Sequence, residues 1–485
     1  MIKWGQWSAS RGDLFPPDFC DVLSGLHEDA PVHSWRRTRV ALRTALGGPP
    51  EETFVSLEEV PMASGSIAQV YRGTIALGPP AAAEAAAAAG TRAAATIPAA
   101  GASTHRLTPV VVKVAHPSVA DHIALDFRVL GALADAVPPW ASRGLALRES
   151  VSQFSHTMTA QCDLRVEAAH MERFANNFAG KAAQITAPRP LFATRDVLVS
   201  TFEAGSSVAA FMHRRTPYNG EVVSLGIDAM LSMLLLHNFV HTDLHPGNIM
   251  VRVVDADGNV VPRDLLHVSP EHAGSVAADA ASAAIDGGAG RKGGAAGVSS
   301  AVEAGNQQAS GACGGAASLP GVTEKAGTGL EPCHHGRPRT QLVLLDFGLA
   351  EELAPRVRHH FLSFISSICA GRGRCAAQHL LQWADVQRCP DPLAFTDDVV
   401  ALFAAHANIH AARGIDLDRV MKETLRVCRK HTVSIDSSYA SLVIAICVLV
   451  GFATSLDDNV NIVDAAVPCL LNYFLTGRYM GRMYG

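Results

Sequence analysis

Two short motifs constrain this chain most strongly. The first spans residues 241–248, with the sequence His-Thr-Asp-Leu-His-Pro-Gly-Asn, and the second is the Asp-Phe-Gly of residues 346–348. An Asp followed five residues later by an Asn, and then by an Asp-Phe-Gly, is an arrangement that holds metal ions on the phosphates of a nucleotide. Phosphoryl transfer needs a carboxylate near the acceptor, oxygen ligands for Mg²⁺ and a cation on the phosphates. The motifs therefore predict Asp243 as the catalytic carboxylate, with Asn248 and Asp346 as ligands of Mg²⁺.

The sequence before these motifs has the order of a kinase, with a small-residue turn and then a lysine-bearing strand. Residues 62–73 predict a turn followed by a strand, and small residues in such a turn let backbone N–H groups approach phosphates. The phosphate-binding candidates in the turn are Ser64, Gly65 and Ser66. Residues 109–114 predict an apolar strand with a single lysine. Because a buried strand rarely carries an unpaired lysine, we expect Lys113 to bind the α- and β-phosphates and to pair with a helix carboxylate. The alternative is a lysine that protects a sheet edge.

The carboxylate partner of Lys113 is predicted on a helix at residues 161–174, where apolar residues recur at helical spacing. Asp163 and Glu167 lie four residues apart and share one face of this helix. We choose Glu167 as the partner, and Asp163 stays open as the alternative. A solvated acidic stripe that pairs with arginines would also explain the two carboxylates.

Residues 197–205 predict a strand that runs into a linker of small residues. This pattern suits a hinge between two lobes, where backbone groups around Thr201 and Phe202 would bond an adenine. Two apolar segments, 225–240 and 441–453, are expected to be buried helices of the larger lobe. A membrane span is the alternative for the second, although its ~20 Å length falls short of the ~30 Å hydrocarbon core.

Two low-complexity stretches interrupt this order, at about residues 79–107 and 255–338. The first is mostly Ala broken by Gly and Pro, and the second is rich in Gly, Ala and Ser with almost no aromatic residues. Such compositions bury too little surface to offset the entropy of ordering, so we expect disordered inserts. Lengthening a closed loop from roughly 12 to 85 residues adds only about 1.7 kcal/mol, so the second insert is compatible with a folded kinase.

Composition limits the remaining function classes. The chain has 485 residues, 48% of them hydrophobic, which is enough for a large core and two lobes. A net charge of −5 without a long basic block argues against a nucleic-acid partner. The ten cysteines include no Cys-x-x-Cys pair, and their scatter fits a reducing compartment. The one local Cys/His cluster, residues 333–335, could bind zinc, but it lies in low-complexity sequence and a solvated loop is the preferred interpretation.

The first residues show a further motif. The segment Lys3-Trp4-Gly5-Gln6 and its continuation to Pro16 is similar to the Lys-x-Gly-Gln signature of the UbiB family, the aarF-domain-containing atypical kinases of mitochondria, plastids and bacteria. The loop at 241–248, with its His-Pro-Gly, resembles the catalytic loop of the same family. Residues 26–27 and 33–35 resemble the mitochondrial branch typified by the second human member.

This resemblance implies an atypical kinase or ATPase that binds ATP or ADP with Mg²⁺ and supports coenzyme Q (ubiquinone) biosynthesis or mitochondrial lipid metabolism. The expected location is the mitochondrial inner membrane, with a plastid as the alternative, and membrane lipid or quinone-pathway enzymes are the expected partners. In the family, the Lys-x-Gly-Gln segment folds over the active site, so Lys3 and Gln6 would be regulatory. No targeting peptide is visible after Met1, so either the protein is cytosolic or the sequence begins inside a longer protein, which is the interpretation we favour.

The chain departs from the family at two places. The family's helix after the lysine strand carries Glu-x-Asp, whereas this chain has Gln161 and Asp163, which alters the charges around the regulatory segment. The family's nucleotide loop is rich in Ala, whereas this chain has Ser-Gly-Ser at 64–66, which relaxes the loop toward that of ordinary kinases.

The segment after the Asp-Phe-Gly motif is short, and no Ala-Pro-Glu follows it. Little chain is left to bind a peptide, so a small molecule, a lipid or water is the expected acceptor rather than a protein. A scaffold that binds nucleotide without turnover is the alternative function, and an antibiotic-type phosphotransferase ranks last. We expect an α+β, bilobal, kinase-like fold with a Lys-x-Gly-Gln helical extension at 1–50, a smaller lobe at 51–205 and a larger lobe at 206–485.

Overall fold

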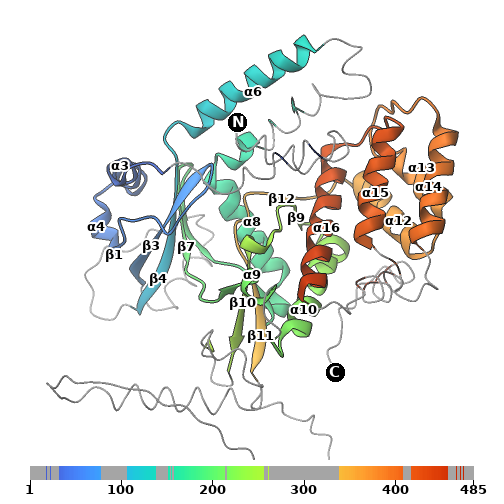
Figure 1. The fold of residues 1–485 in the computed structure, drawn as a ribbon. Coiled ribbons are helices and arrows are strands. Elements are labelled where there is room, and N and C mark those ends of the chain that lie inside the picture. The colour runs from blue at the N-terminus through green and yellow to red at the C-terminus, as the bar shows by residue number, and fades with distance from the viewer. Residues whose placement is uncertain are drawn as a thin grey trace, which may run out of the picture.

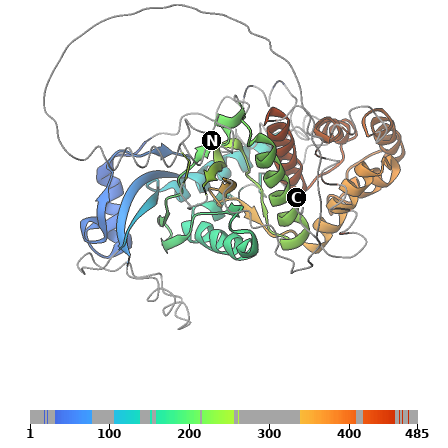
Figure 2. The ribbon, with the colours of Figure 1, turned by 90° about the horizontal axis from the view of Figure 1, so that it is seen from below.

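The computed structural model describes residues 18, 22, 32–77, 106–137, 151–152, 155, 158–212, 216–255, 260–261, 338–407, 415, 417–456, 462, 466, 470 and 473. Lys3 and Gln6 lie outside the described residues, as do nearly all residues of the two predicted inserts. The described parts form a mixed α+β structure. Its N-terminal sheet and its C-terminal helices occupy opposite ends of the molecule (Figure 2).

An antiparallel sheet forms the N-terminal end, with the strand order β1-β3-β4-β7-β6 and β2 paired to β3 (Figure 1). Its strands are β1 (Phe54–Leu57), β2 (Ala63–Ser64), β3 (Ala68–Leu77), β4 (Arg106–Ala115), β6 (Pro190–Ala193) and β7 (Val197–Thr201). The alternate residues Val110, Val112 and Val114 of β4 are fully buried, which is the period of two that a strand imposes. The predicted lysine strand is thus a central strand, since β4 pairs with β3 on one side and β7 on the other.

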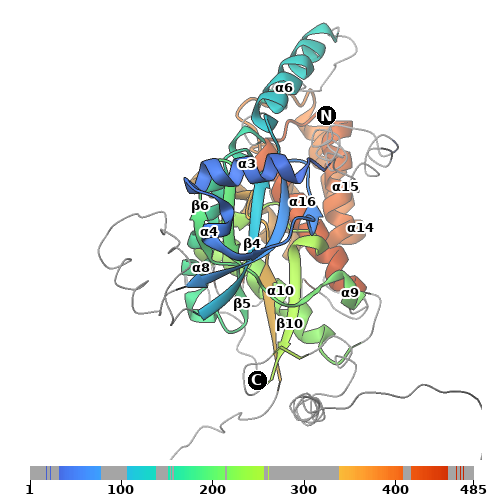
Figure 3. The same ribbon diagram turned by 90° about the vertical axis from the view of Figure 1, so that its left-hand side faces the viewer.

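A helix that precedes the sheet packs onto one of its faces (Figure 3). α3 (Trp35–Leu46) buries Thr38 and Leu42, and it ends at Gly47, whose φ of 74° only glycine adopts without strain. It is followed by the single turn α4 (Pro50–Thr53). Leu42 belongs to the same small hydrophobic core as the sheet residues, so this part of the predicted extension contributes to the sheet's core.

α8 (Leu164–Asn177) connects the sheet to the rest of the molecule. Its N-cap is Asp163, whose side chain accepts a hydrogen bond from the Arg165 backbone N–H. Its buried face carries Leu164, Ala168, Met171 and Phe174, as the helical spacing predicted. These residues pack in the larger hydrophobic core, while the helix also contacts β6 and β7. α6 (Val119–Ala136) follows β4 and projects away from the sheet (Figure 1).

The C-terminal end is helical. Its helices are α9 (Ala209–Met212), α10 (Asn219–Leu231) with its π-helical continuation η3 (Ser232–His237), α12 (Pro355–Cys369), α13 (Gly373–Leu380), α14 (Pro392–His406), α15 (Leu417–Lys430) and α16 (Ser437–Leu456). By length and composition alone, segments Asn219–His237 and Ser438–Leu456 would be able to cross a membrane, but 72% and 61% of their apolar stretches are buried inside the structure. They pack against each other, and the Asn219 side chain donates to the Leu456 carbonyl at 3.1 Å. Both behave as core helices, as expected from the sequence.

Two short strand pairs carry the opening motifs. β10 (Ile249–Val254) pairs antiparallel with β11 (Arg339–Leu344), flanked by β5 (Ile185–Thr186) and β8 (Ser206–Ser207). β9 (Val240–His241), which precedes the hairpin in the sequence, pairs with β12 (Ala350–Glu351), which follows it. Because Ile249 is the register partner of Leu344, the catalytic loop that enters β10 and the Asp-Phe-Gly that leaves β11 meet at one end of the hairpin. The second insert connects the opposite end, where Val254 pairs with Arg339.

Candidate functional site

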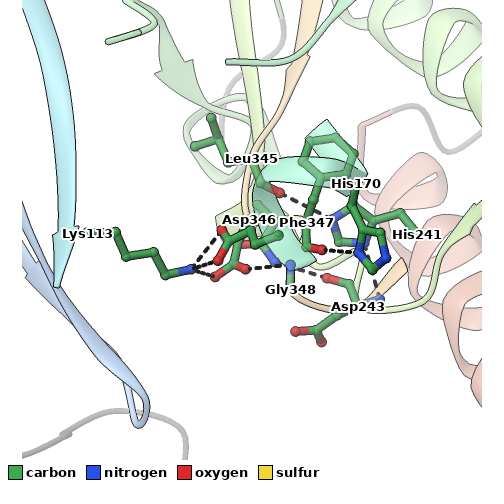
Figure 4. Close-up of polar contacts among 10 residues, drawn as sticks. Lys113, His170, His241, Asp243, Leu345, Asp346, Phe347 and Gly348 are labelled. Atoms are coloured by element: carbon green, nitrogen blue, oxygen red, sulfur yellow. Dashed lines mark hydrogen bonds and ion pairs between the residues drawn. The ribbon is translucent and has the colours of Figure 1, made fainter. Parts of the chain in front are cut away.

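Lys113 meets two carboxylates between the sheet and the hairpin. Its Nζ lies 2.8 Å from both carboxylate oxygens of Glu167 in α8 and 3.2 Å from Asp346 Oδ2 (Figure 4). The Glu167 side chain is 5% exposed and that of Lys113 is 17% exposed, whereas Asp346 is 48% exposed. Three segments that are far apart in the sequence therefore converge on one ammonium group, with its most accessible partner at the predicted metal-binding motif.

The charges in this cluster do not balance. Burial by itself lowers the pKa of Lys113, but Asp346 and Glu167 outweigh burial and raise that pKa, so the amine stays charged. Burial raises the pKa of Glu167 to about 7, against the attraction of Lys113. One ammonium shared by two carboxylates leaves acceptor charge at the exposed Asp346, and an oxygen-rich, anionic position of this kind suits Mg²⁺.

The structure separates the two candidate helix carboxylates. Asp163 caps α8 and bonds the guanidinium of Arg165, at 2.5 Å for the shortest contact. The hydrogen bonds from Arg165 hold the pKa of Asp163 below its ordinary value. Asp163 therefore serves the end of the helix, while Glu167, one turn further on, takes the lysine. Neither a sheet-edge lysine nor a purely solvated acidic stripe describes this arrangement.

The predicted catalytic loop is held by hydrogen bonds between its side chains and backbone groups. The Asn248 side chain donates to the Asp243 carbonyl at 3.0 Å, and the Leu345 N–H donates to the Asn248 carbonyl at 2.8 Å. His241 donates from Nε2 to the Leu345 carbonyl and accepts the Asp243 N–H at Nδ1. Burial lowers the pKa of His241, and this bonding needs the neutral ring. The loop and the Asp-Phe-Gly segment are thus bonded to each other before any ligand arrives.

The His-Pro-Gly inside the catalytic loop has a local purpose. His245 Nδ1 accepts the Gly247 N–H at 3.1 Å, which caps the 3₁₀ turn η4 (Pro246–Asn248), and the His245 carbonyl accepts the Asn248 N–H at 2.8 Å. A Cβ on Gly247 would lie 2.8 Å from the His245 ring, so a larger residue there would push the ring away from its present position. The turn leads into β10 and places the Asn248 carbonyl where it accepts the Leu345 N–H, next to the Asp-Phe-Gly motif.

A hydrogen bond within the segment and the packing of Phe347 hold the Asp-Phe-Gly segment in place. Asp346 has a φ of 50°, a region that Asp tolerates better than most residues but that still carries strain. The Gly348 N–H donates to Asp346 Oδ1 at 3.2 Å. Phe347 is fully buried against Phe174 of α8 and against His241, with ring centroids 4.9 and 5.2 Å away. The helix that carries Glu167 and the motif that carries Asp346 are therefore packed as one unit.

The predicted nucleotide loop is a tight turn between β2 and β3. The Gly65 N–H donates to the Ala68 carbonyl at 2.9 Å. The hydroxyl oxygens of Ser64 and Ser66 are buried, and neither has a hydrogen-bond partner within the described part of the chain. Buried hydroxyls without partners carry a cost of about 1–3 kcal/mol each, so a turn that bonds an incoming group is a physically reasonable use of them.

The hinge residues differ in one respect from the expectation. The N–H groups of both Thr201 and Phe202 already donate within the protein, to the carbonyls of Arg189 and Pro109. The Phe202 ring also lies under the guanidinium of Arg72, 4.6 Å from its carbon. The main chain of these two residues can therefore offer an adenine only carbonyl groups, because Thr201 donates toward β6 and Phe202 donates toward β4.

Gln161 lies beside the Asp-Phe-Gly motif. It is 9% exposed, its Oε1 has no hydrogen-bond partner among the described residues, and its Nε2 is 3.9 Å from where a Cβ on Gly348 would stand. The residue that departs from the family's Glu is thus buried close to Asp346. The regulatory roles predicted for Lys3, Gln6, Gln161 and Asp163 stay predictions, since the first two residues lie outside the described part of the chain.

The donor set fits a magnesium nucleotide. No group of three or more His, Cys, Asp or Glu that could hold a metal occurs among the described residues, and residues 333–335 lie outside them. Mg²⁺ in nucleotide sites takes one or two protein ligands and completes its shell with phosphate oxygens and water. Asn248 and Asp346, at the ends of β10 and β11, have the right chemistry and place for that reduced set.

Several contributing residues have no signal in the motifs. His170 donates from Nδ1 to the Phe347 carbonyl at 2.9 Å and so bonds α8 to the Asp-Phe-Gly segment. It lies three residues after Glu167, on the same helix face, and that spacing is the one sequence signal that points to it. His33 and His116, which bond each other at 2.8 Å, are separated by 83 residues and have no such signal.

Comparisons with known proteins agree with the geometry. The family model described as the ABC1 atypical kinase-like domain matches residues 25–82 and 92–264. The probable serine/threonine-protein kinase abkC of Dictyostelium discoideum is 29% identical over 484 residues, covering 97% of this chain and 62% of that protein. The mitochondrial ABC1 family protein C21C3.03 of Schizosaccharomyces pombe is 26% identical over 496 residues, covering 97% of this chain and 63% of that protein. This chain spans less than two thirds of the length of either relative.

Bacterial relatives and one solved structure extend the comparison. The probable protein kinase UbiB of Aeromonas salmonicida is 28% identical over 259 residues, covering 52% of this chain and 42% of that protein. The structure of Rv3197 with erythromycin, from Mycobacterium tuberculosis, superposes with a TM-score of 0.50 at 14% identity, covering 96% of this chain and 89% of that one, and it supports the fold alone. By its sequence, this chain matches the ABC1 atypical kinase-like domain over residues 25–82 and 92–264, and it is similar to ABC1 and UbiB family proteins.

Proposed function

We propose that this chain binds ATP or ADP with Mg²⁺ and transfers or hydrolyses the terminal phosphoryl group. The observation that carries the proposal is the convergence of Lys113, Glu167 and Asp346 beside the catalytic loop. Lys113 would release Asp346 and bind the phosphates, with Glu167 holding its ammonium in place. Asn248 and Asp346 would then hold the metal, which supplies charge neutralisation on the phosphates.

Asp243 has the remaining role. Its backbone is fixed by Asn248 and His241, while its carboxylate is partly exposed. A carboxylate at this place orients the hydroxyl of an acceptor, or a water molecule, and takes its proton. Because the loop geometry is set by backbone bonds, Asp243 needs little rearrangement to act.

We infer a small-molecule or lipid acceptor rather than a protein. Only residues 349–354 separate the Asp-Phe-Gly motif from α12, and part of that segment is bound as β12 to β9. This leaves little chain to bind a peptide. The mitochondrial designation of the yeast relatives supports a mitochondrial location, and the similarity to bacterial UbiB supports a role in ubiquinone biosynthesis. We extend the proposal to mitochondrial lipid metabolism as the alternative role and to the inner membrane as the place of action.

Nucleotide-dependent stabilisation tests the binding step. A ligand at a hundredfold excess over its Kd stabilises the native state by about 2.7 kcal/mol. We expect Mg²⁺–ATP to raise the melting temperature of the wild type and of Glu423→Gln, an exposed control on α15. Asp346→Asn should lose the magnesium-dependent part of the shift. A full-size shift in Asp346→Asn would show that this residue is not a metal ligand.

A scaffold that binds nucleotide without turnover is the second candidate, and the buried Gln161 favours it, because an amide replaces a charge beside the metal position. Phosphate release by the wild type, with and without lipid vesicles, separates the two. Under the kinase or ATPase proposal, Asp243→Asn should keep the Mg²⁺–ATP stabilisation and lose turnover. If the wild type binds nucleotide and releases no phosphate under either condition, the scaffold is the better description.

A further inference from the structure

A continuous chain of hydrogen bonds connects α3 to the nucleotide loop. Tyr71 OH lies 2.6 Å from Thr38 Oγ1, which lies 2.9 Å from His33 Nε2. His33 Nδ1 lies 2.8 Å from His116 Nδ1, and His116 Nε2 lies 2.8 Å from the Gly65 carbonyl oxygen. Thr38 and Tyr71 are fully buried or nearly so, so the first part of the chain is screened from water.

When both rings are neutral, the donor and acceptor of each hydrogen bond in this series can be assigned from its two ends. The Gly65 carbonyl only accepts, so His116 Nε2 carries a hydrogen. At the other end, the Gln69 side chain accepts the His33 backbone N–H and donates from Nε2 to Tyr71 OH at 2.8 Å. Tyr71 then donates to Thr38, Thr38 donates to His33 Nε2, and His33 donates from Nδ1 to His116 Nδ1. In this arrangement the two imidazoles have opposite tautomers.

The surroundings favour the neutral form of His33. Burial lowers the pKa of His33, and the neighbouring charges of His116 and Arg37 act in the same direction, against the hydrogen bond with Gln69. Burial raises the pKa of Tyr71, so the phenol also stays neutral. If both histidines were protonated, two N–H groups would face each other at 2.8 Å, and the contact between the rings would break.

His116 holds the nucleotide loop at two points. Its backbone N–H donates to the Ile67 carbonyl at 2.8 Å, and its side chain donates to the Gly65 carbonyl. It follows β4 directly, three residues after Lys113. One strand therefore carries the lysine proposed to bind phosphates, while its next residue fixes the turn proposed to cover them.

We propose that His116 is a positioning residue for the nucleotide loop, and that His33 holds it in the tautomer that donates to Gly65. The inference rests on the proposed nucleotide binding. It adds that the segment before α3, through His33, fixes the distance between the nucleotide loop and Lys113. It also adds that protonation of both histidines releases this loop.

Two substitutions at one position separate the positioning role from mere packing. A glutamine amide stands near the place of Nε2 and an asparagine amide near that of Nδ1. His116→Gln therefore keeps a donor for Gly65, whereas His116→Asn loses it. We expect His116→Asn to weaken Mg²⁺–ATP binding about fivefold, the value of one hydrogen bond, and His116→Gln to stay close to the wild type. Affinity is measured by calorimetric titration.

The acid response provides an independent readout. Between pH 7.5 and 5.5 the wild type should lose more affinity for Mg²⁺–ATP than His116→Gln. The variant has only one of the two histidines, so two protonated rings can never face each other in it. Comparing the two proteins at the same pH removes the effect of the nucleotide's own titration. Should His116→Asn fail to fold, His33→Ala tests the same chain from outside the loop, with a smaller loss of affinity expected.

Imidazole ¹⁵N NMR of the nucleotide-free protein should show His116 as the Nε2–H tautomer and His33 as the Nδ1–H tautomer, and the opposite assignment overturns the inference. Equal affinity of His116→Asn and wild type, with equal pH dependence, overturns it as well. If the wild type does not bind Mg²⁺–ATP at all, the proposed function fails first, which the wild-type titration reports by itself.

Discussion

Asp346 carries the most demanding single-residue geometry in the site. It has a left-handed φ, bonds the Gly348 N–H and shares the Lys113 ammonium with Glu167. Packing of the fully buried Phe347 next to it holds Asp346 in this strained conformation. A residue held in this way presents its carboxylate to solvent, and under the proposed function Mg²⁺ would displace only the Lys113 ammonium from it.

Removing Lys113 should therefore destabilise the protein as well as the site. Lys113→Met leaves Glu167 buried beside Asp346 without a cation, and a buried pair broken on one side costs about 3–5 kcal/mol. The double variant Lys113→Met/Glu167→Gln should recover much of this loss and still fail to bind Mg²⁺–ATP. Urea unfolding measures the stability, and Arg426→Met, which breaks an exposed pair, should change it by less than about 1 kcal/mol.

His241 should make the fold sensitive to acid. Its pKa is lowered by burial, so the unfolded chain binds its proton more readily, and this contribution to stability is lost as pH falls below 6.5. The limiting slope is about 1.4 kcal/mol per pH unit. His241→Gln should show a shallower decline of unfolding free energy between pH 7.5 and 5.5. Parallel curves for the two proteins would show that His241 is not protonated on unfolding.

At the scale of elements, α8 and the Asp-Phe-Gly segment behave as one unit. Glu167 pairs with the sheet, His170 bonds the Phe347 carbonyl, and Phe174 stacks near the Phe347 ring. Any movement of the helix away from the sheet would separate Lys113 from Glu167 and would also disturb the Asp-Phe-Gly segment. The position of α8 thus decides whether the site is assembled.

Phe347→Ala should disconnect these elements. The cavity costs about 3–5 kcal/mol of unfolding free energy, because Phe347 is fully buried among aromatic rings. Beyond this loss, hydrogen exchange of the α8 amides should accelerate and Mg²⁺–ATP binding should weaken. Phe347→Leu, which keeps most of the volume, should lose less of both; an unchanged α8 exchange rate in Phe347→Ala would contradict the coupling.

The elements also show what sequence could and could not predict. The sequence could predict the contact among Lys113, Glu167 and Asp346, because each residue lies in a short motif whose chemistry requires a partner. The hydrogen-bond partners of the Thr201 and Phe202 N–H groups could not be predicted from the sequence, because strand register decides them. Cross-chain contacts such as His33 with His116 depend on how α3 packs on the sheet, which no local pattern encodes.

At the scale of the whole molecule, the hairpin of β10 and β11 separates the points where the second insert leaves and returns from the candidate site. Ile249 and Leu344 pair at the site end, while Val254 and Arg339 pair where the insert leaves and returns. With a rise of about 3.4 Å per residue, the two ends of the hairpin are roughly 17 Å apart. The six register pairs close the loop whatever its length.

Deleting residues 262–337 and joining the ends with a short Gly-Ser linker should preserve the fold and the site. Val260 and Val261, which bond the end of β10, are retained. Shortening the loop about sevenfold should add about 1.7 kcal/mol to the unfolding free energy. Mg²⁺–ATP affinity should stay within about twofold of the full chain, because the junction is remote from Asn248 and Asp346. A large loss of affinity would show that the insert takes part in binding.

The spacing of that hairpin also makes it a natural attachment point. A foreign domain whose termini lie close together can be spliced between residues 254 and 339 away from the residues proposed to hold magnesium, because five residues of β10 and of β11 separate that end from the site. A reporter domain installed there would leave the proposed chemistry in place.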